Sequence, residues 1–287
     1  MKDVLLFGNG INRCFGSPSW DDLLKRIADD NFSFYSRNHS QTLEYDKLVL
    51  LNEHVNLAAI ENLDNLTDGY QDIYKKYLEL PIDNILTANF DYAIERSLDS
   101  NFKYENHTGN KVLPQETCCS TLRHIILNNK RIFHIHGELS KRKSICLGTL
   151  DYARNLNGII AKITERIEET GELHLKDTVF SNEFKTWAQL FFTDNIYFIG
   201  IGLCDCDLDL WWLLVYRAKL LSEADNRIKN RIIYYYTHEG NYNHNFVELL
   251  RTLQIEVLNK EVRNGEWNKA YSDIADDIKN KLINQLK

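Results

Sequence analysis

The feature that most constrains the fold of this chain is a series of short, unbroken apolar segments separated by stretches with helical spacing. Strands of a parallel sheet read as continuous apolar runs, because helices cover both of their faces. Such runs alternating with helices predict an α/β domain with right-handed crossovers. The predicted strands are Asp3–Phe7, Asn84–Thr87, Arg131–Ile135, Ser144–Leu147, Asn195–Ile199, Arg231–Tyr236 and Ile255–Asn259.

The stretches between these strands carry apolar residues at the spacing of amphipathic helices. The predicted helices are Thr42–Leu63, Tyr92–Leu98, Asn157–Glu169, Asp207–Leu221 and Tyr271–Leu286, and one more begins after an N-cap at Ser19 or Asp21. We expect a single domain over residues 1–287, with helical insertions at about 30–80 and 150–190. These insertions interrupt the alternation of strand and helix, so we expect them to form a small lid layer beside the sheet.

The charge balance argues against a broad nucleic-acid-binding surface. The 287 residues include 41 acidic and 34 basic side chains, which gives a net charge of −7. The basic cluster Lys141-Arg142-Lys143 is typical of a solvated turn. Direct binding of nucleic acid is therefore not expected.

Cysteine usage and hydropathy point to a cytoplasmic protein. No apolar run approaches the roughly 20 residues that span a bilayer, and no signal-peptide pattern precedes Val4. We expect the six cysteines to be reduced thiols. They form no two C-x-x-C pairs, so the ligand spacing of a structural zinc ribbon is absent and no metal is expected.

The first candidate site is the glycine turn after the first predicted strand, Gly8-Asn9-Gly10-Ile11-Asn12. Glycines at a strand-to-helix turn let backbone N–H groups approach a phosphate closely. The G-x-G-x-x-G pattern is incomplete here, because Arg13 stands at its last position. The Arg13 guanidinium can bond a phosphate or face solvent, and a plain tight turn is the alternative for the whole segment.

The second candidate is Thr87-Ala88-Asn89-Phe90-Asp91, at the carboxyl end of a predicted strand. Ligands of open α/β sheets bind outside the carboxyl ends of the strands. The Asn89 side chain can donate and accept hydrogen bonds at once. Asp91 can contact a ligand, cap the following helix, or do both.

The third candidate is the pair of histidines in Phe133-His134-Ile135-His136-Gly137. Two histidines at i and i+2 on a strand point to the same face, which could suit a metal, but no second ligand cluster accompanies them. Gly137 indicates that the strand ends there, which places His136 at the edge of a cleft. A neutral imidazole in that place can act as a general base, or its ring can simply bond a backbone carbonyl.

The fourth candidate is a second glycine turn between a strand and a helix, Gly200-Ile201-Gly202-Leu203-Cys204-Asp205-Cys206-Asp207. A carboxylate of this loop can accept hydrogen bonds from the hydroxyls of a ribose. Equally, Asp205 or Asp207 can cap the helix, whose dipole favours acids at its start. Cys204 and Cys206 could supply a thiol nucleophile, but no partner residue is assigned to either.

Taken in order, the four segments resemble the sirtuin-like superfamily, especially its bacterial antiphage-defence branch. The family's glycine-rich turn is matched by Gly8–Asn12, and a Trp and Leu-pair segment is matched by Ser19–Leu24. The family's T-T-N-Y-D segment appears as Thr87–Asp91, and its strand ending in His-Gly appears as His136-Gly137. Its late G-x-S-x-x-D turn is similar to Gly200–Asp205. The chain departs from the pattern at Asn9, where a small residue is usual, and at Gly202, where serine is usual.

This resemblance implies a Rossmann-like, mostly parallel sheet that binds NAD⁺ and hydrolyses it to nicotinamide and ADP-ribose. Asn89 would orient the attacking water or the nicotinamide ribose, His136 would be the general base, and Asp91 would hold the carboxamide or ribose. Such a reaction needs positioned polar groups and a modest base, and it needs no metal. The residues implied in NAD⁺ binding are Gly8, Asn9, Gly10, Asn12, Arg13, Thr87, Gly200, Gly202 and Asp205.

Three other functions stay open at this stage. Deacylation is the sister activity in the superfamily, but the four-cysteine ribbon of the deacylases is absent. A module that binds NAD⁺ or ADP-ribose without turnover would use the same glycine turns. A scaffold subunit is the third, in which the aromatic stripe Trp211, Trp212 and Tyr216 is either interface or core.

The resemblance to defence NADases also implies a form of control. Such enzymes deplete NAD⁺ in abortive infection and resemble toxins that are held inactive until then. We expect a homo-oligomer, or a partner such as a DNA-translocase-type ATPase (HerA-like) or an Argonaute-like protein. Sensing of infection would then lie in that partner or in the assembly.

Overall fold

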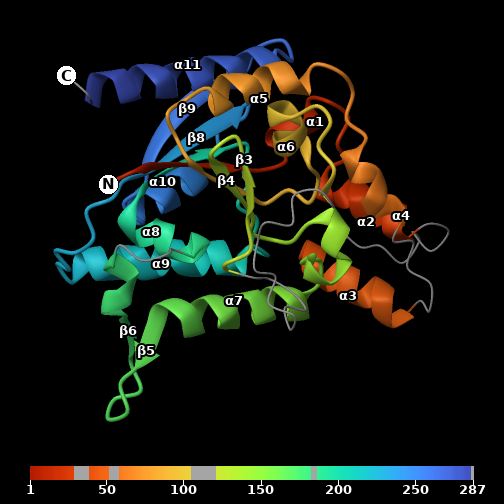
Figure 1. Cartoon of the computed structure of the whole chain (residues 1–287). Helices are drawn as coiled ribbons and strands as arrows, with labels where there is room; N and C mark the ends of the chain where they lie inside the picture. Colours follow the sequence, from red (N-terminus) through yellow and green to blue (C-terminus); the bar gives the residue numbers. More distant parts are fainter. Residues whose placement is uncertain (29–38, 52–57, 105–120, 182–185, 286–287) are drawn as a thin grey trace.

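The centre of the molecule is a seven-stranded sheet in the order β3-β4-β2-β1-β7-β8-β9 (Figure 1). It is seen in a computed structural model that describes residues 1–28, 39–51, 58–104, 121–181 and 186–285. The strand pairs are parallel, except that β3 runs antiparallel to β4. The strands are β1 (Asp3–Phe7), β2 (Asn84–Thr87), β3 (Ile125–Leu127), β4 (Lys130–His134), β7 (Asn195–Ile199), β8 (Ile232–His238) and β9 (Glu256–Glu261).

Helices cover both faces of this sheet, as the unbroken apolar strands predict (Figure 1). Side chains of β1 alternate between two cores: Val4 and Leu6 belong to one, and Leu5 and Phe7 belong to the other. The first core is covered by α7 (Thr149–Ile163), α8 (Leu190–Thr193), α9 (Leu208–Ser222) and α10 (His244–Thr252). The second is covered by α1 (Gly10–Arg13), α5 (Tyr70–Leu78), α6 (Ala93–Leu98) and α11 (Trp267–Gln285). The α/β class predicted from the sequence is confirmed.

A small helical layer lies beside the sheet, within the predicted insertion at 30–80 and just before it (Figure 1). Its elements are α2 (Trp20–Ala28), α3 (Gln41–Leu51), α4 (Ala58–Glu61) and the 3₁₀ turn η2 (Asn62–Asp64). The Ser19 hydroxyl accepts the Asp22 N–H at 3.1 Å, so Ser19 is the N-cap of α2. Parts of the predicted insertion and of the predicted helix Thr42–Leu63, at 29–38 and 52–57, lie outside the described residues.

The predicted strand Ser144–Leu147 is wrong. Ser144 ends a 3₁₀ segment, η4 (Leu139–Ser144), and residues 145–147 form no ladder with the sheet. The segment is apolar because Ile145 and Leu147 pack against the helical layer, in a cluster with Leu23 and Ile60. Burial against helices leaves the same apolar signature as burial in a sheet.

The insertion at 150–190 is less helical than predicted. The helix predicted over Asn157–Glu169 ends at Ile163, and a two-stranded hairpin follows that projects from the body (Figure 1). The rest of the segment forms short 3₁₀ turns, and residues 182–185 lie outside the described residues. The elements after α7 are β5 (Thr164–Arg166), β6 (Leu173–Leu175), η5 (Asp177–Phe180) and η6 (Trp187–Gln189).

The edge strand β3 is not among the strands predicted from the sequence. It pairs with β4 through a two-residue turn at Asn128 and Asn129, which have φ values of 49° and 63°. Positive φ at both central residues defines the tight turn that joins antiparallel strands, and asparagine tolerates it. The Asn-Asn dipeptide is therefore the signal in the sequence that indicates this hairpin.

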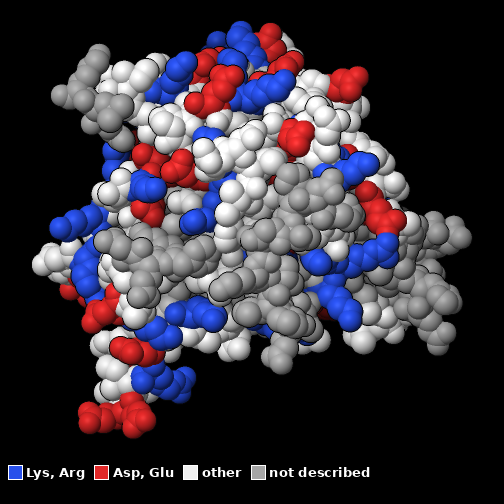
Figure 2. Space-filling model, viewed as in Figure 1, with Lys and Arg blue, Asp and Glu red and all other residues white. Residues whose placement is uncertain are grey.

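Two further features concern the aromatic stripe and the surface. Trp211 and Trp212 pack against the core of their face, and Tyr216 is buried in it, so the stripe is core. Lysine and arginine side chains intermingle with acidic ones on the face drawn in Figure 2, with no broad basic surface there. Within the described residues, no helix combines the length and apolar character that crossing a bilayer requires.

Candidate active site

A cavity of about 580 Å³ opens at the carboxyl edge of the sheet. The parallel register aligns Phe7 with Thr87 and Ile199, and Thr87 with His134. The loops that follow these strands therefore converge on one place. That place lies where the strand order reverses, between β1 and β7, which is where open α/β sheets bind ligands. Its volume is in the range of small-molecule sites.

The two glycine turns pack against each other, and Gly8, Gly10 and Gly200 line this cavity. The Gly10 N–H donates to the Gly200 carbonyl at 2.8 Å, and the Gly8 N–H donates to the Ile199 carbonyl at 2.9 Å. A Cβ on Gly8 would lie 2.6 Å from the Gly200 oxygen, and one on Gly10 would lie 2.3 Å from the Tyr271 hydroxyl. Gly200 itself has a φ of +66°. These three glycines are required by the fold of the turns, whatever ligand they bind.

Other residues of the two turns face the cavity. Gly202 lines it, and a Cβ there would meet no protein atom within 4 Å. Arg13 is exposed and lines the same cavity, so its guanidinium is placed to meet an anionic group. Asn9 also lines it and holds the neighbouring loop, donating to the Pro18 carbonyl at 2.8 Å and accepting from the Ser17 hydroxyl at 2.8 Å.

Asn89 lies in the turn after β2, on the wall of the cavity. Its backbone N–H donates to the Thr87 hydroxyl at 3.1 Å, and its side-chain amide donates to the Gly8 carbonyl at 3.3 Å. Thr87 is 1% exposed and is not among the lining residues, so its hydroxyl shapes the turn from below. The Asn89 side chain is thereby held between two strand ends.

Asp91 joins a buried chain of hydrogen bonds. One oxygen accepts the Asn12 amide at 2.8 Å and the other accepts the Ala93 N–H at 3.0 Å, at the start of α6. Asn12 in turn accepts from the Tyr74 hydroxyl at 2.7 Å. Burial raises the pKa of Asp91 to about 6. Asp91 thus precedes the N-cap residue Tyr92, accepts the first N–H of its helix and also lines the cavity, whereas Asn12 is fully buried behind it.

The two histidines near the end of β4 have separate partners. The His134 ring lies 2.9 Å from the Asn89 carbonyl and 2.9 Å from the Glu95 carboxylate. Burial lowers the pKa of His134, but the Glu95 carboxylate outweighs it and raises the pKa to about 9. His136 lines the cavity, and its Nε2 lies 3.1 Å from the Asp209 carboxylate. The two imidazoles bind different carboxylates and do not form a joint ligand pair.

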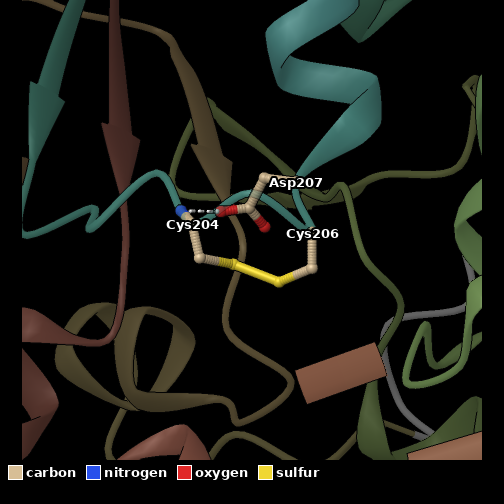
Figure 3. A group of neighbouring side chains, drawn as sticks. All are labelled: Cys204, Cys206 and Asp207. Atoms are coloured by element: carbon tan, nitrogen blue, oxygen red, sulfur yellow. Dashed lines mark hydrogen bonds between the residues drawn. A yellow bond between two sulfur atoms is a disulfide. The ribbon is translucent and has the colours of Figure 1, made fainter. Parts of the chain in front are cut away.

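In the loop after β7, the structure contradicts the prediction that all cysteines are reduced thiols. Cys204 and Cys206 form a disulfide, drawn in Figure 3, instead of two reduced thiols. Their Cα atoms lie 5.3 Å apart because the loop turns between them, a separation that suits a bridge. Neither Cys14 nor Cys146 is in a disulfide, and Cys118 and Cys119 lie outside the described residues. Because both sulfurs are bonded, this loop offers neither a thiol nucleophile nor a thiolate ligand in this state.

Asp207, rather than Asp205, is the acid of this loop that lines the cavity. Asp207 accepts the Cys204 N–H at 2.9 Å (Figure 3), and burial raises its pKa to about 6. Asp205 is exposed and is not among the lining residues. The sequence identifies the loop but does not distinguish which of its acids points inward.

Several lining residues carry no signal in the sequence. Tyr152 on α7 donates to Asp207 and meets the His136 ring edge to face, with centroids 5.2 Å apart. An aromatic wall comes from the end of β8 and from α10 and α11, and the helical layer adds an apolar wall. Two of the apolar lining residues, Trp20 and Leu23, lie in the segment Ser19–Leu24, which the resemblance already includes. The others are Tyr234, Tyr236, Phe246, Trp267, Tyr271 and Leu63. No local motif marks these others, because they converge only through the packing of distant elements.

A cavity at the switch point of a parallel sheet, between two glycine turns, is typical of α/β proteins that bind nucleotides. Residues 83–258, more than half of the chain, match the family described as the SIR2-like domain. The chain therefore belongs to the SIR2-like domain family, whose members are NAD-dependent enzymes. The match includes the segments of Asn89, His136 and Gly200, and it begins after the first glycine turn. A search of curated proteins finds no match.

Proposed function

We propose that this chain hydrolyses NAD⁺ at the nicotinamide–ribose bond and releases nicotinamide and ADP-ribose. The observation that carries the proposal is that Asn89, Asp91 and His136 line one cavity together with both glycine turns. Membership of an NAD-dependent family supports NAD⁺ as the ligand. The cavity volume of about 580 Å³ suits a small molecule of this class.

The cavity contains the groups that this reaction requires. As the bond to nicotinamide breaks, positive charge builds on the ribose and the cationic leaving group becomes neutral. Water adds to the ribose carbon and gives up one proton, so that NAD⁺ and water yield nicotinamide, ADP-ribose and H⁺. His136 takes that proton, Asn89 orients the water or the ribose, and Asp91 holds the carboxamide or ribose. General-base help of this kind is worth roughly 10²–10⁴-fold.

One feature of the sequence supports hydrolysis over the sister activity of deacylation. The sequence contains no C-x-x-C pair, so it lacks the ligand spacing of the zinc ribbon of sirtuin deacylases. Around the cavity, the small helical layer supplies the apolar residues Trp20, Leu23 and Leu63, and a wall of this kind is compatible with either reaction.

The experiment is to incubate the purified chain with NAD⁺ and to follow nicotinamide and ADP-ribose by chromatography. The wild type is expected to produce both in equal amounts, and Asn89→Ala and His136→Ala are expected to produce neither. His174→Ala, which changes an exposed histidine on β6, is the matched control and should cleave at the wild-type rate. Full cleavage by Asn89→Ala or His136→Ala would overturn the assignment. NAD⁺ that binds but stays intact would favour a binding module.

We also propose that the reaction depletes NAD⁺ during antiphage defence, in the cytoplasm of a bacterial cell. The resemblance of the four motifs to the defence branch supports this proposal. Cells that express the wild type should lose NAD⁺ after phage infection, and cells that express His136→Ala should keep it. Equal NAD⁺ levels in the two cultures would contradict a defence role.

Control by assembly is part of the same proposal. We expect a homo-oligomer, or a complex with a partner such as a DNA-translocase-type ATPase. The molar mass in solution tests the first form. Addition of the product of a neighbouring gene to the NAD⁺ assay tests the second. A chain that is monomeric and fully active alone would contradict both.

A further inference from the structure

The His136 ring is set against a carboxylate that no sequence motif marks. Its Nε2 lies 3.3 Å from one oxygen of Asp209 and 3.1 Å from the other. His136 is 3% exposed and Asp209 is 0% exposed. Because a carboxylate can only accept, the Nε2 nitrogen carries the hydrogen of this contact.

Asp209 is itself fixed by two further donors. The Asn155 amide on α7 donates to one oxygen at 2.6 Å, and the Leu210 N–H donates to the other at 2.9 Å. Asp209 also stands in the first turn of α9, where the helix dipole favours a negative charge. Asn155 donates in addition to the Ile135 carbonyl at 3.3 Å, which ties α7 to the residue before His136. These donors satisfy both oxygens of a carboxylate that has no access to solvent.

Within the part of the chain that the structure describes, three elements present charged or titratable groups to the His136 ring. Tyr152 comes from α7, Asp207 comes from the loop before α9, and Asp209 comes from α9 itself. His134 lies two residues away, but its ring bonds Glu95 and the Asn89 carbonyl. The Asp209 carboxylate is in direct contact with the ring of His136 through Nε2.

We propose that Asp209 is a positioning residue that fixes the ring of His136 with its hydrogen on Nε2 and its lone pair on Nδ1. When Nδ1 takes the proton of the attacking water, the Asp209 carboxylate balances the charge of the imidazolium. The proton later leaves Nδ1 for solvent, and Asp209 keeps the ring in place throughout. Asn155 supports this pair through its bond to Asp209. The inference rests on the proposed function, in which His136 is the base.

The variant Asp209→Asn tests it with almost no change in volume. The side-chain –NH₂ of the new residue can donate to Nε2, which moves the ring hydrogen to Nδ1. Nδ1 then has no lone pair with which to accept the proton of water. We expect kcat for NAD⁺ cleavage to fall by about 10²–10⁴-fold with KM nearly unchanged. A rise in KM with an unchanged kcat would overturn the proposal.

The matched control is Glu95→Gln, the same type of substitution beside the neighbouring histidine. His134 can keep its hydrogen on Nδ1, donate to the Asn89 carbonyl and accept from the new amide through Nε2. We expect kcat of the folded Glu95→Gln protein to stay within a few-fold of wild type. A loss of kcat equal to that of Asp209→Asn would show a general effect of packing and would overturn the proposal.

¹⁵N NMR of histidine-labelled protein shows directly which ring nitrogen of His136 carries the hydrogen. The measurement needs neither NAD⁺ nor turnover. We expect the neutral His136 ring to carry its hydrogen on Nε2 in the wild type and on Nδ1 in Asp209→Asn. The same position in both proteins would overturn the inference. Hydrogen on Nε2 in a wild type that does not cleave NAD⁺ would overturn only the proposed function.

A second variant covers the case in which Asp209→Asn does not fold. Asn155→Ala leaves the pair intact and removes one donor to the carboxylate. We expect a smaller loss of kcat, about 10–100-fold, as for other residues that orient a functional histidine from behind. A kcat of Asn155→Ala equal to that of wild type would mean that Asn155 does not support the His136–Asp209 pair.

Discussion

His134 and His136 lie two residues apart at the end of β4, and each ring is buried against a buried carboxylate. Their surroundings differ in one respect: His136 lines the cavity, whereas His134 lies beneath the Asn89 turn and bonds its carbonyl. Burial and an acidic partner alone therefore do not identify a catalytic histidine. The difference teaches that residues of this site divide into those that line the cavity and those that hold its walls.

The largest expected effect separates the two histidines by function. His136→Ala should lower NAD⁺ turnover by about 10²–10⁴-fold, because it removes the proposed base. Its melting temperature should fall less than that of His134→Ala, because Asp209 keeps the Asn155 and Leu210 donors. His134→Ala should instead lower the stability, because Glu95 is left as an unpaired buried charge. Turnover assays and thermal melts of both variants make the comparison. Loss of stability in His136→Ala with turnover retained would reverse the two assignments.

The second effect is on stability and depends on pH. The pKa of His134 is raised to about 9, from an ordinary value near 6.5, by Glu95 against the opposing effect of burial. The pair therefore adds stability that is complete below pH ~6.5 and is lost as the pH rises through about 9. Glu95→Gln should cost about 2–3 kcal/mol at pH 6.

Denaturant unfolding of wild type and Glu95→Gln at pH 6, 8 and 10 measures this dependence. The difference between the two proteins should shrink steadily as the pH rises. A difference in unfolding free energy that is the same at all three pH values would mean that His134 is not charged in the folded protein.

The third effect separates a glycine that the packing of the turns requires from a glycine that only lines the cavity. In Gly10→Ala, the new Cβ would lie 2.3 Å from the Tyr271 hydroxyl and 2.7 Å from the Gly200 Cα, so we expect a loss of about 1–3 kcal/mol of stability. In Gly202→Ala, the Cβ meets no protein atom within 4 Å, so stability should be unchanged. If the ligand lies against Gly202, the KM for NAD⁺ should rise about 10-fold, which corresponds to about 1.4 kcal/mol.

Thermal melts and steady-state kinetics of both glycine variants test this division. An unchanged KM in Gly202→Ala would place the ligand elsewhere in the cavity. A Gly10→Ala protein as stable as wild type would mean that the two turns can move apart.

The smallest effect concerns the acids of the loop after β7. Asp207 lines the cavity and Asp205 is exposed outside it, so Asp207→Asn should raise KM about 3–10-fold and Asp205→Asn less than about 2-fold. Kinetics at pH 8, above the pKa of about 6 for Asp207, keep its carboxylate charged in the wild type. If Asp205→Asn raises KM more than Asp207→Asn does, Asp205 is the acid that contacts the ligand, as the motif in the sequence implies.

The strand ends of the site are predictable from the sequence. The apolar runs of β1, β2, β4 and β7 are short, and parallel register places their ends side by side. The amino-acid pattern alone therefore places the segments of Gly8, Asn89, His136 and Gly200 at one edge of the sheet. Their roles in catalysis and binding remain predictions.

The supporting residues are not predictable, for a physical reason. Asn155 and Asp209 lie on separate helices, and Asn155 meets Asp209 beside His136 only because α7 and α9 pack together on one face of the sheet. Side-chain direction in an irregular loop has no periodicity, which is why the sequence does not distinguish Asp205 from Asp207. Apolar residues that face a helical layer resemble a strand, which explains the error at Ser144–Leu147.

The most direct test of the account compares wild type and His136→Ala on the same two quantities, NAD⁺ affinity by calorimetry and the rate of nicotinamide release. The account predicts affinities that agree within a few-fold and a release rate that is at least about 10²-fold lower in the variant. Equal rates of nicotinamide release from the two proteins would contradict it.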